Sequence, residues 1–171
     1  MIQIVIHCLP HEIDQLEQTL IQLKRNSIKF ESSKDKFIVD VYLNLNLTDW
    51  ESSKLDKEFF LDKFSHLHEL TTTWAQTKFI SGVGNTNILG CVSHRRQVFN
   101  ETEASALLLL DTDMIFSENM LWYMYNSHLQ LQNDYPNHIL TPQIPKGWDS
   151  SWDCLVNEKY LNRSDREHIT R

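Results

Sequence analysis

The sequence predicts an α/β protein in which helices cover both faces of a mostly parallel, doubly wound sheet. Two observations lead to this fold class. Short apolar runs rich in β-branched residues alternate with longer segments whose apolar positions recur every three or four residues. The connections between successive runs are also long enough to hold a helix each, which parallel neighbouring strands require. In such sheets, ligands bind beyond the carboxyl ends of the strands.

Length and composition fit one such domain. The chain has 171 residues, of which 41% are hydrophobic and 23% charged, so a sizeable core can form and wholesale disorder is not expected. A net charge of -7 argues against a nucleic-acid partner, because phosphate contacts need clustered Lys and Arg. Three widely separated cysteines without CxxC spacing favour reduced thiols.

No signal peptide and no transmembrane segment are predicted. The N-terminal apolar run is short, lacks a basic region before it, and meets His7 and Pro10. No apolar stretch approaches the roughly 20 residues that cross a bilayer as a helix. We therefore expect a cytoplasmic protein.

The first predicted strand covers residues 2–6, a continuous β-branched run that suits a strand buried on both faces. Pro10 stops it. An amphipathic helix follows, because Leu16, Leu20 and Leu23 recur at helical spacing. Two basic residues and then Asn26 end this helix, as is typical of helix C-termini.

The middle of the chain predicts two further strands and two helices. Residues 36–47 are rich in Phe, Ile, Val and Tyr and predict the second strand. A helix that begins at a capping-box pattern runs from there to about Trp74. A short strand over residues 78–81 follows. The next helix is marked by Val92 and Phe99 among its apolar positions.

The next strand ends in two carboxylates. Residues 106–110 form an unbroken apolar run, as expected of a central parallel strand, and Asp111-Thr112-Asp113 follows directly. Side chains two apart in an extended segment point to the same side, so Asp111 and Asp113 can reach one hard cation. Magnesium or manganese held in this way keeps open positions for diphosphate oxygens. Beyond the motif, Ser117 is expected to cap a helix, and residues 139–141 predict a last short strand.

The chain resembles the GT-A glycosyltransferases, in particular the family-two-like nucleotide-sugar transferases. The resemblance is carried by the strand end Leu9-Pro10-His11-Glu12, the helix with Asn87-x-x-Gly90 and Arg95-Arg96, the motif Leu110-Asp111-Thr112-Asp113 and the strand end Thr141-Pro142-Gln143. It implies a GT-A nucleotide-sugar-binding core over residues 1–144. Residues 145–171 would then be an irregular C-terminal segment, which is either part of the acceptor side or the end of a truncated domain.

The same resemblance implies an enzyme that moves a sugar from a nucleoside-diphosphate sugar to a hydroxyl of a glycan, lipid or protein. The reaction would depend on Mn²⁺ or Mg²⁺ and would invert the anomeric centre. The implied nucleotide-sugar contacts are Leu9, Pro10 and Glu12 in the nucleotide pocket, Asn46 or Asp49 near the base, Arg95 or Arg96 near the donor, and Asp111 at the ribose. Asp111 and Asp113 would bind the metal, with Asp113 as the principal ligand.

The C-terminal segment holds the candidates for the catalytic base. Asp149 and Asp153 are each preceded by a tryptophan. A sugar ring can stack on such a tryptophan while the nearby carboxylate takes a proton from the acceptor hydroxyl. The alternative interpretation is that Trp148 and Trp152 simply anchor a loop to the core.

Two other functions fit the same motif. A non-catalytic or partial GT-A domain would bind a nucleotide-sugar or a partner protein without turnover, and no acidic base segment of the family's usual kind is recognisable before residue 171. A haloacid-dehalogenase-like phosphatase also places Asp-x-Asp after an apolar strand, with Asp111 as nucleophile and Asp113 as acid/base. The motif comes late for that family, which leaves few residues for its later motifs.

Overall fold

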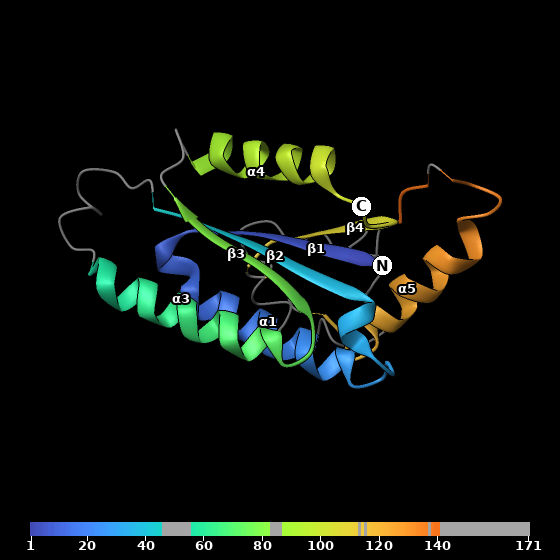
Figure 1. The fold of residues 1–171 in the computed structure, drawn as a ribbon, viewed down its shortest axis with the longest axis horizontal. Helices are drawn as coiled ribbons and strands as arrows, with labels where there is room; N and C mark the ends of the chain where they lie inside the picture. Colours follow the sequence, from blue (N-terminus) through green and yellow to red (C-terminus); the bar gives the residue numbers. More distant parts are fainter. Residues whose placement is uncertain (46–55, 83–86, 113, 115, 137, 141–171) are drawn as a thin grey trace, which may run out of the picture. The chain divides into compact units, whose positions relative to one another are not determined.

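The computed structural model describes residues 1–45, 56–82, 87–112, 114, 116–136 and 138–140 (Figure 1). The chain divides into two compact units, Met1–Leu131 and Gln132–Arg171, and each is treated by itself. The helices and strands named below all belong to the first unit. Among the described helices, none combines the length and apolar character that a bilayer crossing requires.

Four parallel strands form the sheet of the first unit. They are β1 (Ile2–Cys8), β2 (Phe37–Asn44), β3 (Gln76–Gly82) and β4 (Ala106–Leu110). Their order across the sheet is β3-β2-β1-β4, and each neighbouring pair is parallel. A helix joins each strand to the next along the chain. The predicted α/β class with a parallel sheet is therefore confirmed.

Helices lie on both faces of this sheet (Figure 1). α1 (Ile13–Ser27) and α3 (Lys57–Thr72) cover one face, α4 (Asn87–Glu101) covers the other, and α5 (Met120–Leu131) packs against α1. The chain advances from β1 to β3 with its helices on one face, then returns past β1 to β4 with its helix on the opposite face. A constant crossover hand requires this change of face. The winding therefore reverses between β1 and β4.

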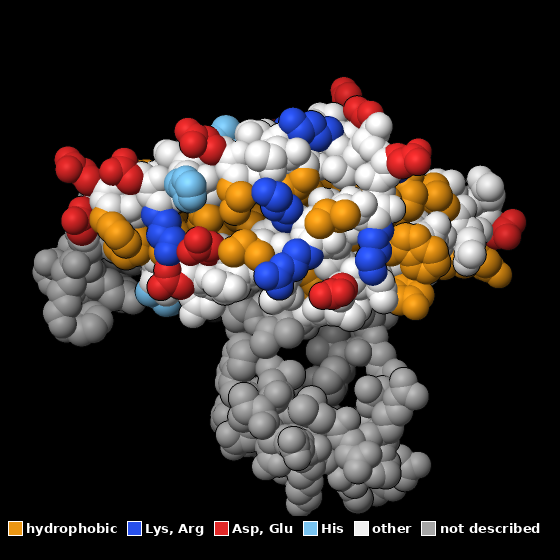
Figure 2. Space-filling model, turned by 90° about the horizontal axis from the view of Figure 1, so that it is seen from below, with side chains coloured by type: hydrophobic (Ala, Val, Ile, Leu, Met, Phe, Trp, Pro, Cys, Tyr) orange, Lys and Arg blue, Asp and Glu red, His pale blue; other side chains and the backbone are white. Residues whose placement is uncertain are grey.

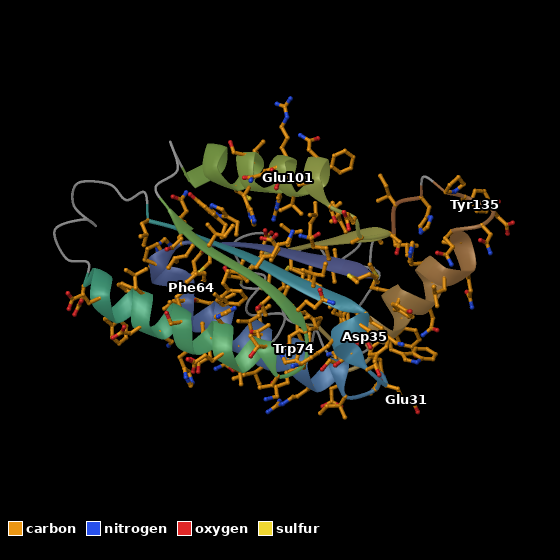
Figure 3. The ribbon with its side chains drawn as sticks, in the orientation of Figure 1. Glu31, Asp35, Phe64, Trp74, Glu101 and Tyr135 are labelled. Atoms are coloured by element: carbon orange, nitrogen blue, oxygen red, sulfur yellow. The ribbon has the colours of Figure 1, made fainter. Side chains whose placement is uncertain are left out.

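The main apolar core lies between the sheet and the α1/α3 face. Alternate residues of β1 and β2 point there and are fully buried, as is the predicted stripe of α1; they are Ile4, Ile6, Val39, Val41, Leu16, Leu20 and Leu23. Figure 3 shows Phe64 of α3 on this side of the sheet and Glu101 of α4 on the other. Each such aliphatic side chain contributes about 1.5–3 kcal/mol to folding through burial.

The sheet face toward α4 is polar. Gln3 of β1 and Asp40 of β2 are buried on that face, and so is His94 of α4. The carboxylate of Asp40 accepts hydrogen bonds from Gln3 Nε2 at 2.9 Å and from His94 Nε2 at 2.8 Å. Thr102, just beyond the end of α4, donates to Gln3 Oε1. A network of hydrogen bonds therefore fixes α4 to the sheet, where an apolar stripe would be usual.

Charges of both signs are interspersed on the surface that carries α1 and α3 (Figure 2). Lys63 of α3, for example, forms ion pairs with Asp14 and Glu17 of α1. This face therefore does not offer the clustered positive charge that a nucleic-acid backbone requires.

Three details differ from the sequence-based expectations. β4 was expected to be central, but within the described sheet it lies at an edge and Leu109 is 51% exposed. α5 begins at Met120, and Ser117 precedes it by a turn in which the Ser117 carbonyl accepts from Met120 N at 3.1 Å. Ile139 and Leu140 are not in a strand. An apolar run shows that a segment tends to be buried, but not how many strands it pairs with, which explains the differences at β4 and at residues 139 and 140.

Candidate functional site

The candidate site lies at the carboxyl ends of β1 and β4, where the winding of the sheet reverses. Ile6 of β1 pairs with Leu110 of β4, so the residues that follow, His7 and Asp111, are neighbours at this edge. Crevices at such switch points are the usual ligand sites of open α/β sheets. The structure thus places the first aspartate of the predicted motif where the fold favours a ligand.

Asp111 contacts one of the two arginines that the resemblance singles out. Arg95 Nη2 donates to Asp111 Oδ1 at 2.6 Å, with the Arg95 side chain 30% exposed and that of Asp111 68% exposed. A pair this exposed stabilises the fold by only about 0–1 kcal/mol. Its significance is positional, because it holds a carboxylate and a guanidinium together at the switch point of the sheet. Arg96, the next residue on α4, is exposed.

A short 3-10 helix, η1 (Pro10–Glu12), closes the end of β1 beside these residues. Glu12 Oε2 accepts from Leu9 N at 2.9 Å, which fixes the turn. Burial raises the pKa of the Cys91 thiol, Arg95 lowers it, and Asp111 and Glu12 raise it. The segment predicted to line the nucleotide pocket therefore belongs to the same electrostatic neighbourhood as Asp111 and Arg95.

Gly90 allows α4 to approach the ends of β1 and β2. A Cβ at this position would lie 2.4 Å from Asn44 Nδ2 and 3.4 Å from His7 Nε2. The first distance is far below van der Waals contact, so a larger residue would push α4 away or displace Asn44. The glycine that the resemblance picked out in α4 therefore has a packing role at the edge of the site.

We expect Gly90→Ala to lower the free energy of unfolding by about 1–3 kcal/mol through overpacking. Alanine is the better helix former by about 1 kcal/mol, so in an open helix the same change would stabilise the protein. Urea unfolding followed by circular dichroism measures the difference. The destabilisation caused by Gly90→Ala should be smaller in an Asn44→Ala background, because that variant lacks the atom that the alanine Cβ would contact. An increase in stability in the wild-type background would contradict this packing.

His7 is a site residue that the sequence did not reveal. Its side chain stacks on Tyr42 with ring centroids 5.9 Å apart, and it is 9% exposed. Burial first, and then the electrostatic effects of His94 and Arg95, lower the pKa of His7 to about 4, although Asp111 raises it. The imidazole is therefore neutral at physiological pH. A single histidine near a strand end carries no motif, and only the strand register places it beside Asp111.

α1 anchors the segment that carries the motif. Thr19 Oγ1 donates to the carbonyl of Thr112, the middle residue of the motif, at 2.8 Å, and Thr112 is 3% exposed. Asn26 Nδ2 donates to the Ser117 carbonyl at 3.2 Å, and Gln22 accepts from a backbone N–H of the same segment. The three α1 side chains recur every three or four residues, so they share one helix face. They fix the backbone that follows β4.

The remaining predicted site residues, Asp113, Asn46, Asp49, Asp149 and Asp153, lie outside the described residues. Within the part of the chain that is described, no three or more His, Cys, Asp and Glu side chains gather as a ready metal site. Magnesium sites are commonly built from one or two carboxylates together with substrate phosphates. Asp111, an exposed carboxylate at the switch point of the sheet, fits as one such ligand.

Comparisons with protein-family models, with curated proteins and with solved structures find no match.

Proposed function

We propose that this chain is the nucleotide-sugar-binding domain of a GT-A-type glycosyltransferase. It would transfer a sugar from a nucleoside-diphosphate sugar to an acceptor hydroxyl, with Mn²⁺ or Mg²⁺. The observation that supports this most is the position of Asp111, which follows β4 at the switch point of a parallel sheet and is bonded to Arg95. Together the two side chains offer an oxygen ligand for a cation and a charged donor for a phosphate.

Each described residue of the site would have a separate task. Asp111 would hold the cation together with Asp113, and a cation bound there offsets the negative charge that develops on the leaving nucleoside diphosphate. Arg95 orients the Asp111 carboxylate and can donate to a phosphate oxygen. Thr19 keeps the backbone of the motif in place from α1.

The proposed reaction also needs a catalytic base, and the candidates for it belong to the C-terminal segment, residues 145–171. Direct displacement at the anomeric carbon inverts the sugar and needs a base that takes the proton of the acceptor hydroxyl. Asp149 and Asp153 remain our candidates for this base. A non-catalytic nucleotide-sugar-binding domain would need the donor site but no such base.

Binding of a nucleoside diphosphate should stabilise the fold in a metal-dependent manner. A ligand present at about a hundredfold its dissociation constant contributes roughly 2.7 kcal/mol. In a chain of this size that corresponds to a rise in Tm of roughly 5–10 °C. The test is a thermal-shift screen of uridine, guanosine, adenosine and cytidine diphosphates, each with and without manganese.

An unchanged Tm with every diphosphate in the presence of manganese would refute the donor site. A rise in Tm with the diphosphate of one base identifies the nucleotide-sugars to test as donors. Release of that diphosphate from its nucleotide-sugar, with or without an acceptor, then distinguishes the enzyme from a binding domain. Binding without any release would favour the non-catalytic alternative.

A further inference from the structure

Buried nitrogen atoms without a hydrogen-bond partner gather beneath α4. Within the described residues, His7 Nε2, His94 Nδ1 and Arg95 Nε are all buried and unpartnered. They belong to α4 and to the end of β1 that α4 covers. Buried polar groups almost always find partners, because an unmade hydrogen bond costs free energy. Several such atoms in one place therefore call for a ligand that satisfies them.

Two of these nitrogens belong to side chains that interact with Asp111. Arg95 uses Nη2 for Asp111 and leaves Nε, on the same edge of the guanidinium, without a partner. His7 follows the residue that pairs with Leu110, and the charges of Arg95 and Asp111 both act on its ring. Arginine Nε is always a donor, and a neutral imidazole carries one N–H. Arg95 Nε is therefore a donor, and His7 Nε2 is one in the tautomer that carries the proton there.

We propose that His7 and Arg95 form a two-donor clamp for the diphosphate of the ligand, next to the cation position at Asp111. The inference rests on the proposed function for its ligand class. An anion with several oxygens suits this arrangement, because one oxygen can accept from Arg95 Nε while another accepts from His7, and the cation offsets the charge of Asp111.

Access to the clamp involves α4. Both nitrogens are shielded from solvent in this state. Gly90 of α4 stands beside His7 Nε2 and presents no side chain to it. No side chain at position 90 therefore has to be displaced for an anion to reach His7 Nε2.

The experiment compares two replacements of His7. In His7→Gln the side-chain amide can place a nitrogen near the position of imidazole Nε2, whereas His7→Leu keeps the bulk and loses the hydrogen bond. Manganese with inorganic pyrophosphate is titrated by calorimetry into the wild type and both variants, with circular dichroism to confirm folding. We expect His7→Leu to bind about ten- to a hundredfold more weakly, and His7→Gln to stay within a few-fold of the wild type.

His68→Leu serves as the control, because His68 lies on α3 and bonds to Thr77 of β3, away from the carboxyl edge. Wild-type affinity in a folded His7→Leu variant would overturn the clamp. Equal losses in folded Gln and Leu variants would also overturn it, because they would point to packing against Tyr42 instead. Pyrophosphate binding that depends on His7, together with no nucleoside diphosphate effect in the thermal-shift screen, would keep the clamp and refute the proposed function.

Discussion

Replacing His94 by leucine is expected to lower the free energy of unfolding by about 3–5 kcal/mol, because it leaves the carboxylate of Asp40 buried without its charged or polar partner. The side chains of His94 and Asp40 are 5% and 4% exposed, and His94 Nε2 lies 2.8 Å from Asp40 Oδ1. Gln3 would remain as a donor to Asp40, but a single neutral amide does not replace both contacts. α4 would lose its main polar connection to β2.

Urea unfolding of His94→Leu, of Asp40→Leu and of the double variant measures this coupling. The double variant should be less destabilised than the sum of the two single variants, because it removes both buried polar groups together. His68→Leu is again the control, since His68 is only partly buried and its hydrogen-bond partner is the hydroxyl of Thr77, not a carboxylate. If His94→Leu lowers the free energy of unfolding by less than about 1 kcal/mol, the His94–Asp40 pair does not hold α4 on the sheet.

The apolar side of the fold could be predicted from the sequence because burial there follows a simple period. Leu16, Leu20 and Leu23 mark one face of a helix, and all three are fully buried. The β-branched runs likewise mark strands whose parallel pairing follows from the helices between them. In these elements the local pattern and the tertiary packing agree.

α4 shows where such patterns fail. Its apolar positions Val92 and Phe99 predict a helix correctly, but these side chains are 55% and 72% exposed, whereas Gly90 and His94 face the sheet. The buried positions of α4 among its described residues are Gly90, His94 and Val98, and a single apolar side chain there does not make an apolar stripe. Its partners lie on β1 and β2, far away in the sequence, so no spacing within α4 reveals the buried face.

One part of the candidate site could be predicted from the sequence, and another part could not. Asp111 stands out because a carboxylate that follows an apolar strand is visible in one stretch of sequence. His7 and Thr19 became visible only through the register of β1 with β4 and through the packing of α1 on the segment after β4. Both depend on contacts between residues about a hundred positions apart, which composition and periodicity do not encode.

Asp111→Asn is expected to cause a large loss of ligand binding. Asparagine keeps nearly the same shape but removes the charge, so the cation loses a ligand. The free energy of unfolding should change by less than about 1 kcal/mol, because the Asp111 side chain is 68% exposed. We expect the affinity for a nucleoside diphosphate with manganese to fall by about ten- to a hundredfold or more. By the resemblance, Asp113→Asn should weaken metal-dependent binding at least as much.

The central claim is that Asp111 binds a metal–diphosphate complex at the switch point of the sheet. Calorimetric titration of manganese and the best nucleoside diphosphate into the wild type, Asp111→Asn and Asp14→Asn tests it most directly. Asp14 is an exposed aspartate of α1 that pairs with Lys63, so its variant controls for the loss of one surface charge. We predict wild-type affinity in Asp14→Asn, a strong loss in Asp111→Asn, and weak binding by the wild type when manganese is left out. Equal affinity of the folded Asp111→Asn protein and the wild type would contradict the claim.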